Sequence, residues 1–188
     1  MHLTILIILL AACAVLFVLE LKGVRTTLAL EFKGDIKRES RWLAQYGQSV
    51  CTPVAALLVW RLDPDPQLKP ILVIACVLAA SISCMILKRM LGRVRPGRED
   101  AGRFLGPTWR HANYRESFPS SHSACAMALS AALAMLYPSG APVFWALAII
   151  TATLRYLLDA HWPSDVLGGS ALGLAVAHAV MALFAHYR

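Results

Sequence analysis

His161 and Asp165 lie four residues apart, on either side of a Trp162-Pro163 pair that interrupts a helix. At this spacing a carboxylate can accept the N–H of an imidazole and fix its tautomer. The other ring nitrogen is then available as a nucleophile or a base. A capped turn would have the same residues, so the pair alone leaves both interpretations open.

A second cluster is FPSSHS, residues 118 to 123. Pro119 followed by Ser120 predicts a helix start with the serine as N-cap, so that free backbone N–H groups and the positive end of the helix dipole face outward. Helix N-termini bind phosphate. His122 would project from the first turn beside such an anion, although a single histidine at a helix start is more often structural.

The third cluster supplies positive charge. In KRMLGRVRP, residues 88 to 96, Lys88 and Arg95 are seven apart, which is two turns of a helix that continues past the membrane edge. Arg155 ends a later apolar stretch. Cations aligned in this way suit a dianionic phosphate. A basic cluster that touches lipid headgroups is the alternative.

The composition indicates that a membrane surrounds these clusters. Hydrophobic residues make up 58% of the chain and charged residues 15%, which is too apolar for a typical soluble domain. No linker or repeat divides the 188 residues, so we expect one integral membrane domain over 1–188. The five cysteines are odd in number and lack CxxC spacing, which favours small residues packed between helices over disulfides or a metal site.

A hydrocarbon core of about 30 Å requires roughly 20 mostly apolar residues per helix. Six segments qualify, of which the second is the weakest: Leu3–Leu19, Tyr46–Leu62, Pro70–Leu87, Ser123–Tyr137, Ala141–Leu158 and Val166–Phe184. The first could be a signal peptide, but no Lys or Arg precedes it, which favours a retained span. We therefore predict an all-α, six-transmembrane-helix bundle with a short interfacial helix within Lys22–Trp42.

The net charge of +7 is concentrated on one face of this bundle. Alternating spans place 20–45, 88–122 and 155–165 together, with every Lys and Arg of the chain except Arg61, Lys69 and Arg188. The positive-inside rule assigns this face to the cytoplasm, whereas a site for anionic headgroups would explain the same charge. The loop 97–118 mixes its arginines with Phe104, Leu105, Trp109 and Tyr114, as expected of a segment among headgroups. For this loop and for Lys22–Trp42, an ordinary connecting loop is the alternative.

Together the three clusters favour a phosphoryl ligand, and they resemble the signature of the type 2 phosphatidic acid phosphatase superfamily. That signature has a lysine, six residues and Arg-Pro; then Pro-Ser-Gly-His; then an arginine, five residues, a histidine, three residues and an aspartate. The matching residues here are Lys88 with Arg95-Pro96, Pro119-Ser120-Ser121-His122, and Arg155 with His161 and Asp165. Two positions differ: Ser121 replaces the usual glycine, and Leu154 stands where a serine or threonine often precedes the arginine.

The resemblance implies a role for each residue. His161 is the nucleophile and becomes a phosphohistidine, Asp165 orients its ring, and His122 protonates the leaving oxygen and then activates water. The phosphate oxygens are held by Lys88, Arg95, Arg155, Ser120 and Ser121, the last through its amide. No metal and no cofactor is implied.

The implied substrate is a membrane lipid phosphate: phosphatidic acid, phosphatidylglycerol phosphate, an isoprenyl pyrophosphate or a lipid A phosphate. The resemblance also implies a bacterial inner membrane location with the site facing the periplasm, against the positive-inside count. No nucleic-acid partner is expected. The oligomeric state is not indicated. A lipid phosphotransferase and a non-catalytic lipid-phosphate binding or transport protein are the alternatives. The vanadium haloperoxidases share the motifs but are soluble.

Overall fold

The computed structural model describes residues 2–28, 33–48, 50–108, 110, 112–158 and 161–185. These residues form seven α-helices and no β-strand, which confirms the predicted all-α class. The helices are α1 (His2–Leu21), α2 (Gly34–Leu43), α3 (Cys51–Leu62), α4 (Lys69–Leu91), α5 (Ser121–Leu136), α6 (Ala141–Leu157) and α7 (Pro163–Ala185). Two short 3₁₀ turns, Asn113–Arg115 and Pro138–Gly140, precede α5 and α6.

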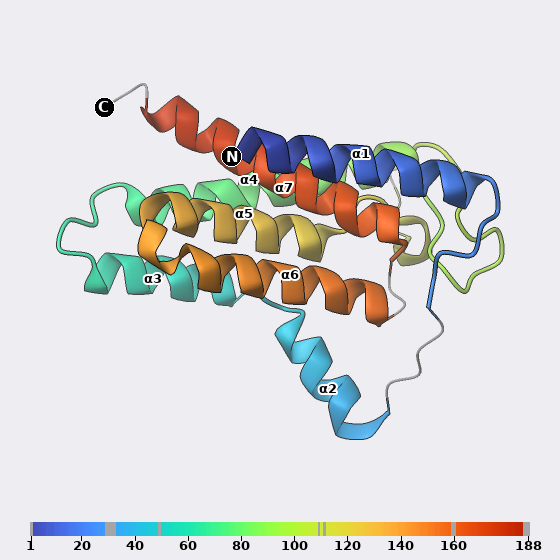
Figure 1. Ribbon diagram of the computed structural model, residues 1–188, viewed down its shortest axis with the longest axis horizontal. Helices are drawn as coiled ribbons and strands as arrows, with labels where there is room; N and C mark the ends of the chain where they lie inside the picture. The colour runs from blue at the N-terminus through green and yellow to red at the C-terminus, as the bar shows by residue number, and fades with distance from the viewer. Residues whose placement is uncertain are drawn as a thin grey trace.

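Helix α5 is the centre of the bundle and packs against α4, α6 and α7 (Figure 1). Every residue from Ser123 to Ala134 is buried. Small residues allow this close approach: a Cβ on Gly173 of α7 would lie 2.1 Å from the carbonyl oxygen of Ala124. Backbones in membrane bundles commonly approach each other in this way.

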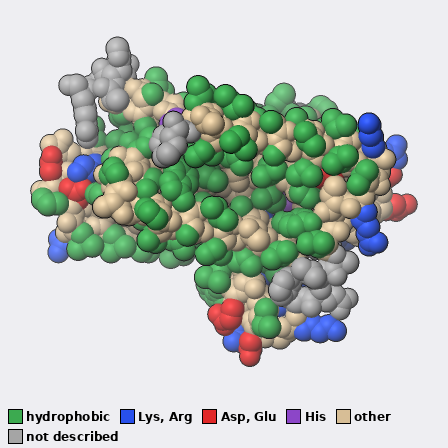
Figure 2. Space-filling view, in the orientation of Figure 1, with side chains coloured by type: hydrophobic (Ala, Val, Ile, Leu, Met, Phe, Trp, Pro, Cys, Tyr) green, Lys and Arg blue, Asp and Glu red, His purple; other side chains and the backbone are tan. Residues whose placement is uncertain are grey.

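Four described helical segments are long and apolar enough to cross a membrane: Leu3–Leu21, Lys69–Leu91, Pro138–Leu157 and Pro163–Phe184. Hydrophobic side chains cover the flank of the bundle, while charged side chains gather at its ends and on α2 (Figure 2). The chain is an integral membrane protein. Helices α3 and α5 have 12 and 16 residues, or about 18 and 24 Å, so the six-span count stays a prediction.

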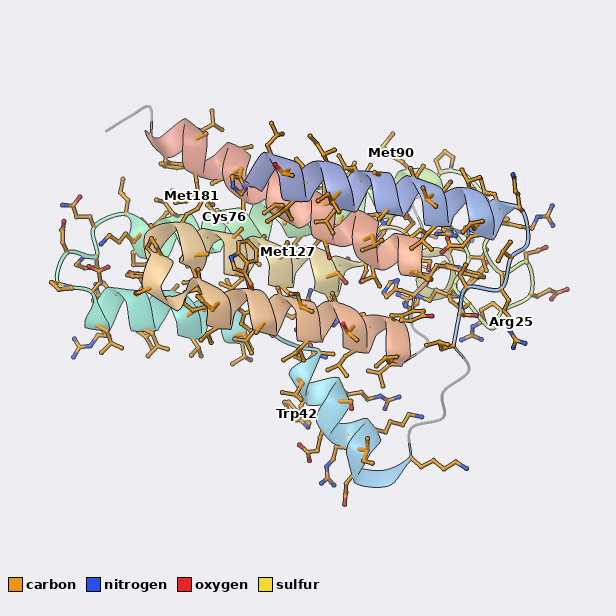
Figure 3. All side chains as sticks on the ribbon, viewed as in Figure 1. Arg25, Trp42, Cys76, Met90, Met127 and Met181 are labelled. Atoms are coloured by element: carbon orange, nitrogen blue, oxygen red, sulfur yellow. The ribbon has the colours of Figure 1, made fainter. Side chains whose placement is uncertain are left out.

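Three boundaries differ from those predicted. Helix α3 begins at Cys51 rather than near Tyr46, because a series of turns connects α2 to it. Among the described residues of the segment predicted to hold an interfacial helix, the helix is α2, which leaves the bundle at an angle and carries Trp42 outside it (Figure 3). Helix α1 extends past Leu19 and therefore includes Glu20.

Four of the five cysteines pack inside the bundle, as predicted. All five are free, and all are buried except Cys51, which is half-buried. Cys76, labelled in Figure 3, lies between helices of the bundle and has no exposed surface. Packing, rather than cross-linking, is the role that this environment supports.

The order of the helices brings the three sequence clusters to one end of the bundle. Helices α4 and α6 end there, and helices α5 and α7 begin there (Figure 1). Helix α1 runs antiparallel to α7 and also ends on this side (Figure 1). The site is therefore built from helix ends and the long loop between α4 and α5.

Candidate active site

His161 lies immediately before α7, which begins at Pro163. Proline suits the first turn of a helix because its fixed φ is already helical and its missing N–H is not needed there. The side chain of His161 is 2% exposed. Its Nδ1 lies 3.6 Å from Oδ2 of Asp165 and has no hydrogen-bond partner among the described residues. The predicted pair is thus brought together, at a distance slightly longer than a hydrogen bond.

Burial determines the protonation state of His161. It lowers the pKa of the imidazole from its ordinary value of 6.5 to about 3, against the opposing effect of the Asp165 carboxylate. The positive charges of Lys88 and Arg95 lower that pKa further. At neutral pH the imidazole is therefore neutral, which is the form that can act as a nucleophile.

The start of α5 is fixed to the start of α7. Ser120 is the N-cap of α5, as predicted, and its backbone N–H donates to the carbonyl oxygen of Asp165 at 2.9 Å. A Cβ on Gly169 would lie 2.4 Å from the carbonyl oxygen of Ser120, so only glycine permits this approach. Ser121 follows as the first helical residue and does not adopt a positive φ. The glycine usual at that position is therefore not required by the backbone here.

Lys88 and Arg95 converge by a different route from the one predicted. Helix α4 ends at Leu91, and Gly92 takes a left-handed φ of 62°, so the two cations do not share one continuous helix. The loop instead turns back, and both donate to the carbonyl oxygen of Glu116, Lys88 Nζ at 2.5 Å and Arg95 Nη2 at 3.4 Å. The prediction of two aligned helical turns was wrong, but the cations meet at one point.

His122 lies in the first turn of α5, just before the predicted span that starts at Ser123. The charges of Arg155, His161, Lys88 and Arg95 all act on its ring, which places the residues of the three clusters around one centre. Burial, followed by Arg155, lowers the pKa of His122 to about 3. Nε of Arg155 is buried and has no hydrogen-bond partner within the described part of the chain.

The structure adds Arg93 and Glu20, which the sequence motifs had not singled out. Arg93 Nη1 donates to Oδ1 of Asp165 at 2.6 Å and to Oγ of Ser164 at 2.7 Å. Its Nη2 donates to Oε2 of Glu20 at 2.7 Å. The side chains of Arg93 and Glu20 are each 1% exposed and that of Asp165 is 0% exposed. Three charges are therefore buried together beside His161.

Other groups complete this buried network. Oδ2 of Asp165 accepts hydrogen bonds from the Ser117 hydroxyl and, at 3.0 Å, from the backbone N–H of Trp162. The guanidinium of Arg93 lies 5.1 to 5.5 Å from the ring centroids of Phe17, Phe104 and Trp162, within cation–π range. Asp165 is thus held by several donors at once, which fixes the carboxylate relative to His161.

The loop 97–118 only partly matches the expected headgroup-facing segment. Leu105 and Tyr114 are exposed, but Phe104 packs against Phe17 at 5.5 Å between ring centroids. Trp109 lies outside the described residues. A cavity of about 650 Å³ in this loop is lined by Arg95, Arg98, Glu99, Asp100 and four other residues.

The sequence held part of the information that identifies the residues of this buried network. Glu20 is the single acidic residue between positions 2 and 28, and an ionisable group at the end of an apolar span suggests a function. Arg93 stands two residues before Arg95, where it is one of several arginines. Only the packing of α1 against α7 distinguishes it from them.

Comparison with known proteins identifies a family and several relatives. The model of the PAP2 superfamily matches residues 69–187. The lipid A 1-phosphatase of Rhizobium etli is 41% identical over 99 residues, which is 52% of this chain and 42% of that protein. The putative undecaprenyl-diphosphatase YbjG of Escherichia coli is 27% identical over 124 residues, 65% of this chain and 61% of that protein.

The fold has a relative among solved structures as well. It is the crystal structure of a transmembrane PAP2-type phosphatidylglycerolphosphate phosphatase from Bacillus subtilis. The match covers 100% of this chain and 97% of that chain, with a TM-score of 0.57 and 16% sequence identity. This chain spans only 42% and 40% of the length of two lipid A 1-phosphatases that it matches. Because the family model covers more than half of the chain, this protein belongs to the PAP2 superfamily.

Proposed function

We propose that this protein is a metal-independent lipid phosphatase that works through a phosphohistidine intermediate. The observation that carries the proposal is the convergence of His161, His122 and three cations at the N-terminus of α5. Such a centre offers a neutral imidazole as nucleophile, together with amides and fixed charges for the phosphate oxygens. Positioning and charge stabilisation provide most of the catalysis in phosphoryl transfer.

In the first step, Nε2 of His161 attacks the phosphorus and the bond between phosphorus and the lipid oxygen breaks. The electron pair leaves with that oxygen, which takes a proton from His122. In the second step, water attacks the phosphohistidine, the bond between nitrogen and phosphorus breaks, and His122 takes the proton of the water. Asp165 holds the ring of His161 and stabilises its positive charge in both steps.

Protonation of His122 depends on the bound phosphate. In the free protein, burial and Arg155 hold the pKa of His122 near 3. A dianionic phosphate between Lys88, Arg95 and Arg155 would offset these cations and raise that pKa. The acid would therefore form when substrate binds.

The substrate is proposed to be a lipid phosphate monoester or pyrophosphate. Two observations support this: the site lies at the ends of membrane-embedded helices, and relatives are named for lipid A and undecaprenyl diphosphate. The location proposed is a bacterial inner membrane with the site facing the periplasm. This orientation is tested by labelling Arg98→Cys and Asp65→Cys with an impermeant maleimide in intact cells. Labelling of Asp65→Cys alone would show the opposite orientation.

The test of the activity is phosphate release by purified protein in detergent, across a panel of lipid phosphates with EDTA present. His161→Ala should abolish release. His178→Ala is the matched control, because that ring lies within α7, where Nδ1 is 2.8 Å from the carbonyl oxygen of Leu174. It should retain release.

Each other outcome favours a different function. Release that survives in His161→Ala, or that requires a metal, refutes the phosphohistidine mechanism. Transfer of phosphate to a second lipid rather than to water would show a phosphotransferase. Tight binding without release would show a binding or transport protein.

A further inference from the structure

A second cavity lies beside the site, between α2 and the start of α3. Its volume is about 690 Å³. Lys37, Arg38, Arg41 and Trp42 of α2 line one side, and Cys51 at the start of α3 contributes to the other. None of the described residues that line it is acidic. The cavity therefore combines positive charge with an apolar wall.

Two of its cations are available to a ligand. Arg38 is partly neutralised, because its Nη2 lies 3.1 Å from Asp35 and 3.3 Å from Glu39. Lys37 and Arg41 form no ion pair with any residue that the structure describes. Charge complementarity thus favours an anionic occupant.

The cavity is connected to the phosphate-binding residues. Gln48, which lines it, donates from Nε2 to the carbonyl oxygen of Ser121 at 3.4 Å. Arg41 lies close enough to Arg155 for their charges to interact. The hydroxyl of Thr151 donates to the carbonyl oxygen of Leu43 at 3.4 Å, which ties the end of α2 to α6. A headgroup bound at Arg155 could therefore reach the cavity.

We propose that this cavity binds a second anionic group of the lipid substrate, carried on a headgroup that extends from the phosphate at His161 toward α2. The proposal rests on the proposed phosphatase function and narrows its substrate class. The second phosphate of a pyrophosphate is bonded directly to the first and would stay among Lys88, Arg95 and Arg155. A group that reaches α2 requires a spacer, such as a sugar that bears its own phosphate.

The cavity at Arg95 is less suited to such a group. Its lining includes Glu99 and Asp100, which would repel an anion. An anionic phospholipid of the bilayer is the other candidate for the α2 cavity, and the experiment includes it as a competitor.

The test measures binding in the His161→Ala background, so that the result does not depend on turnover. The probes are two acylated glucosamine disaccharides in neutral detergent micelles, identical except that one has a phosphate at the reducing end and the other has a phosphate at each end. We expect the two-phosphate lipid to bind about tenfold more tightly, as one additional charge-assisted contact would give. Lys37→Gln or Arg41→Gln should bring the ratio of the two affinities close to one.

Lys22→Gln is the control, since this exposed cation follows α1 and does not line the cavity. It should leave the ratio unchanged. Equal binding of the two probes, or a preference that both α2 variants retain, overturns the proposal. So does a preference that added phosphatidylglycerol abolishes, because the bilayer lipid would then be the occupant. Turnover by the unmodified protein, measured separately, tests the phosphatase reaction itself.

Discussion

The buried charges beside His161 lead to a quantitative prediction about Arg93. Two ion pairs in this chain have the same N–O distance of 2.6 Å but opposite burial: Arg93 with Asp165, at 1% and 0% exposure, and Arg103 with Asp100, at 72% and 47%. Distance alone predicts equal contributions to stability. Burial predicts unequal contributions, because a charge that has been removed from water is stabilised by its partner instead of by solvent.

Arg93→Met keeps much of the side-chain volume but leaves the carboxylates of Glu20 and Asp165 buried without their cation. We expect a loss of about 3–5 kcal/mol in the free energy of unfolding, as for other broken buried pairs. Arg103→Met should cost less than about 1 kcal/mol, because water and salt screen an exposed pair. Equilibrium unfolding in mixed micelles measures both, with the folded fraction followed by tryptophan fluorescence.

A double variant makes the test more specific. Glu20→Gln removes one of the two carboxylates that Arg93→Met leaves uncompensated, so Arg93→Met/Glu20→Gln should be more stable than Arg93→Met by about 1–3 kcal/mol. Equal losses of unfolding free energy in Arg93→Met and Arg103→Met would refute the explanation based on buried charge. So would a double variant whose loss equals the sum of the losses in Arg93→Met and Glu20→Gln.

Two further variants and a pH series test the close helix packing and the neutral state of His161. Gly169→Ala and Gly173→Ala each place a Cβ against a carbonyl oxygen, at 2.4 and 2.1 Å, and each should cost about 1–3 kcal/mol in unfolding experiments. Only Gly169→Ala, which displaces Ser120, should also lower kcat strongly; an equal effect of both on kcat would contradict the role given to this contact. Because the folded-state pKa of His161 is about 3 and its unfolded value is near 6.5, the unfolded state binds more protons as the pH falls below 6.5, and stability is lost in that direction. Between pH 7.5 and 5 the protein should lose about 2 kcal/mol more than His161→Ala, and an equal loss in both would mean that His161 titrates normally when folded.

The sequence by itself determined the class of the protein and predicted most of the candidate site. Apolar segment lengths are set by the thickness of a membrane, so the helices were predictable within a few residues. The candidate site residues could be named because their types and spacings resemble a known phosphatase signature, and the structure places them close to the ends of helices. Lys88 and His161 are examples, as each stands at or beside a helix end.

Only the tertiary structure decided how these residues meet. The left-handed turn at Gly92 ends α4 and lets the loop return Arg95 to Lys88, a path that helical periodicity cannot predict. The involvement of Arg93 and Glu20 also depended on tertiary packing, because whether an arginine is paired or exposed is set by contacts between residues distant in sequence. Glu20 and Arg93 are 73 positions apart in the sequence. Their contact matters because it is buried, and no local sequence pattern predicts that burial.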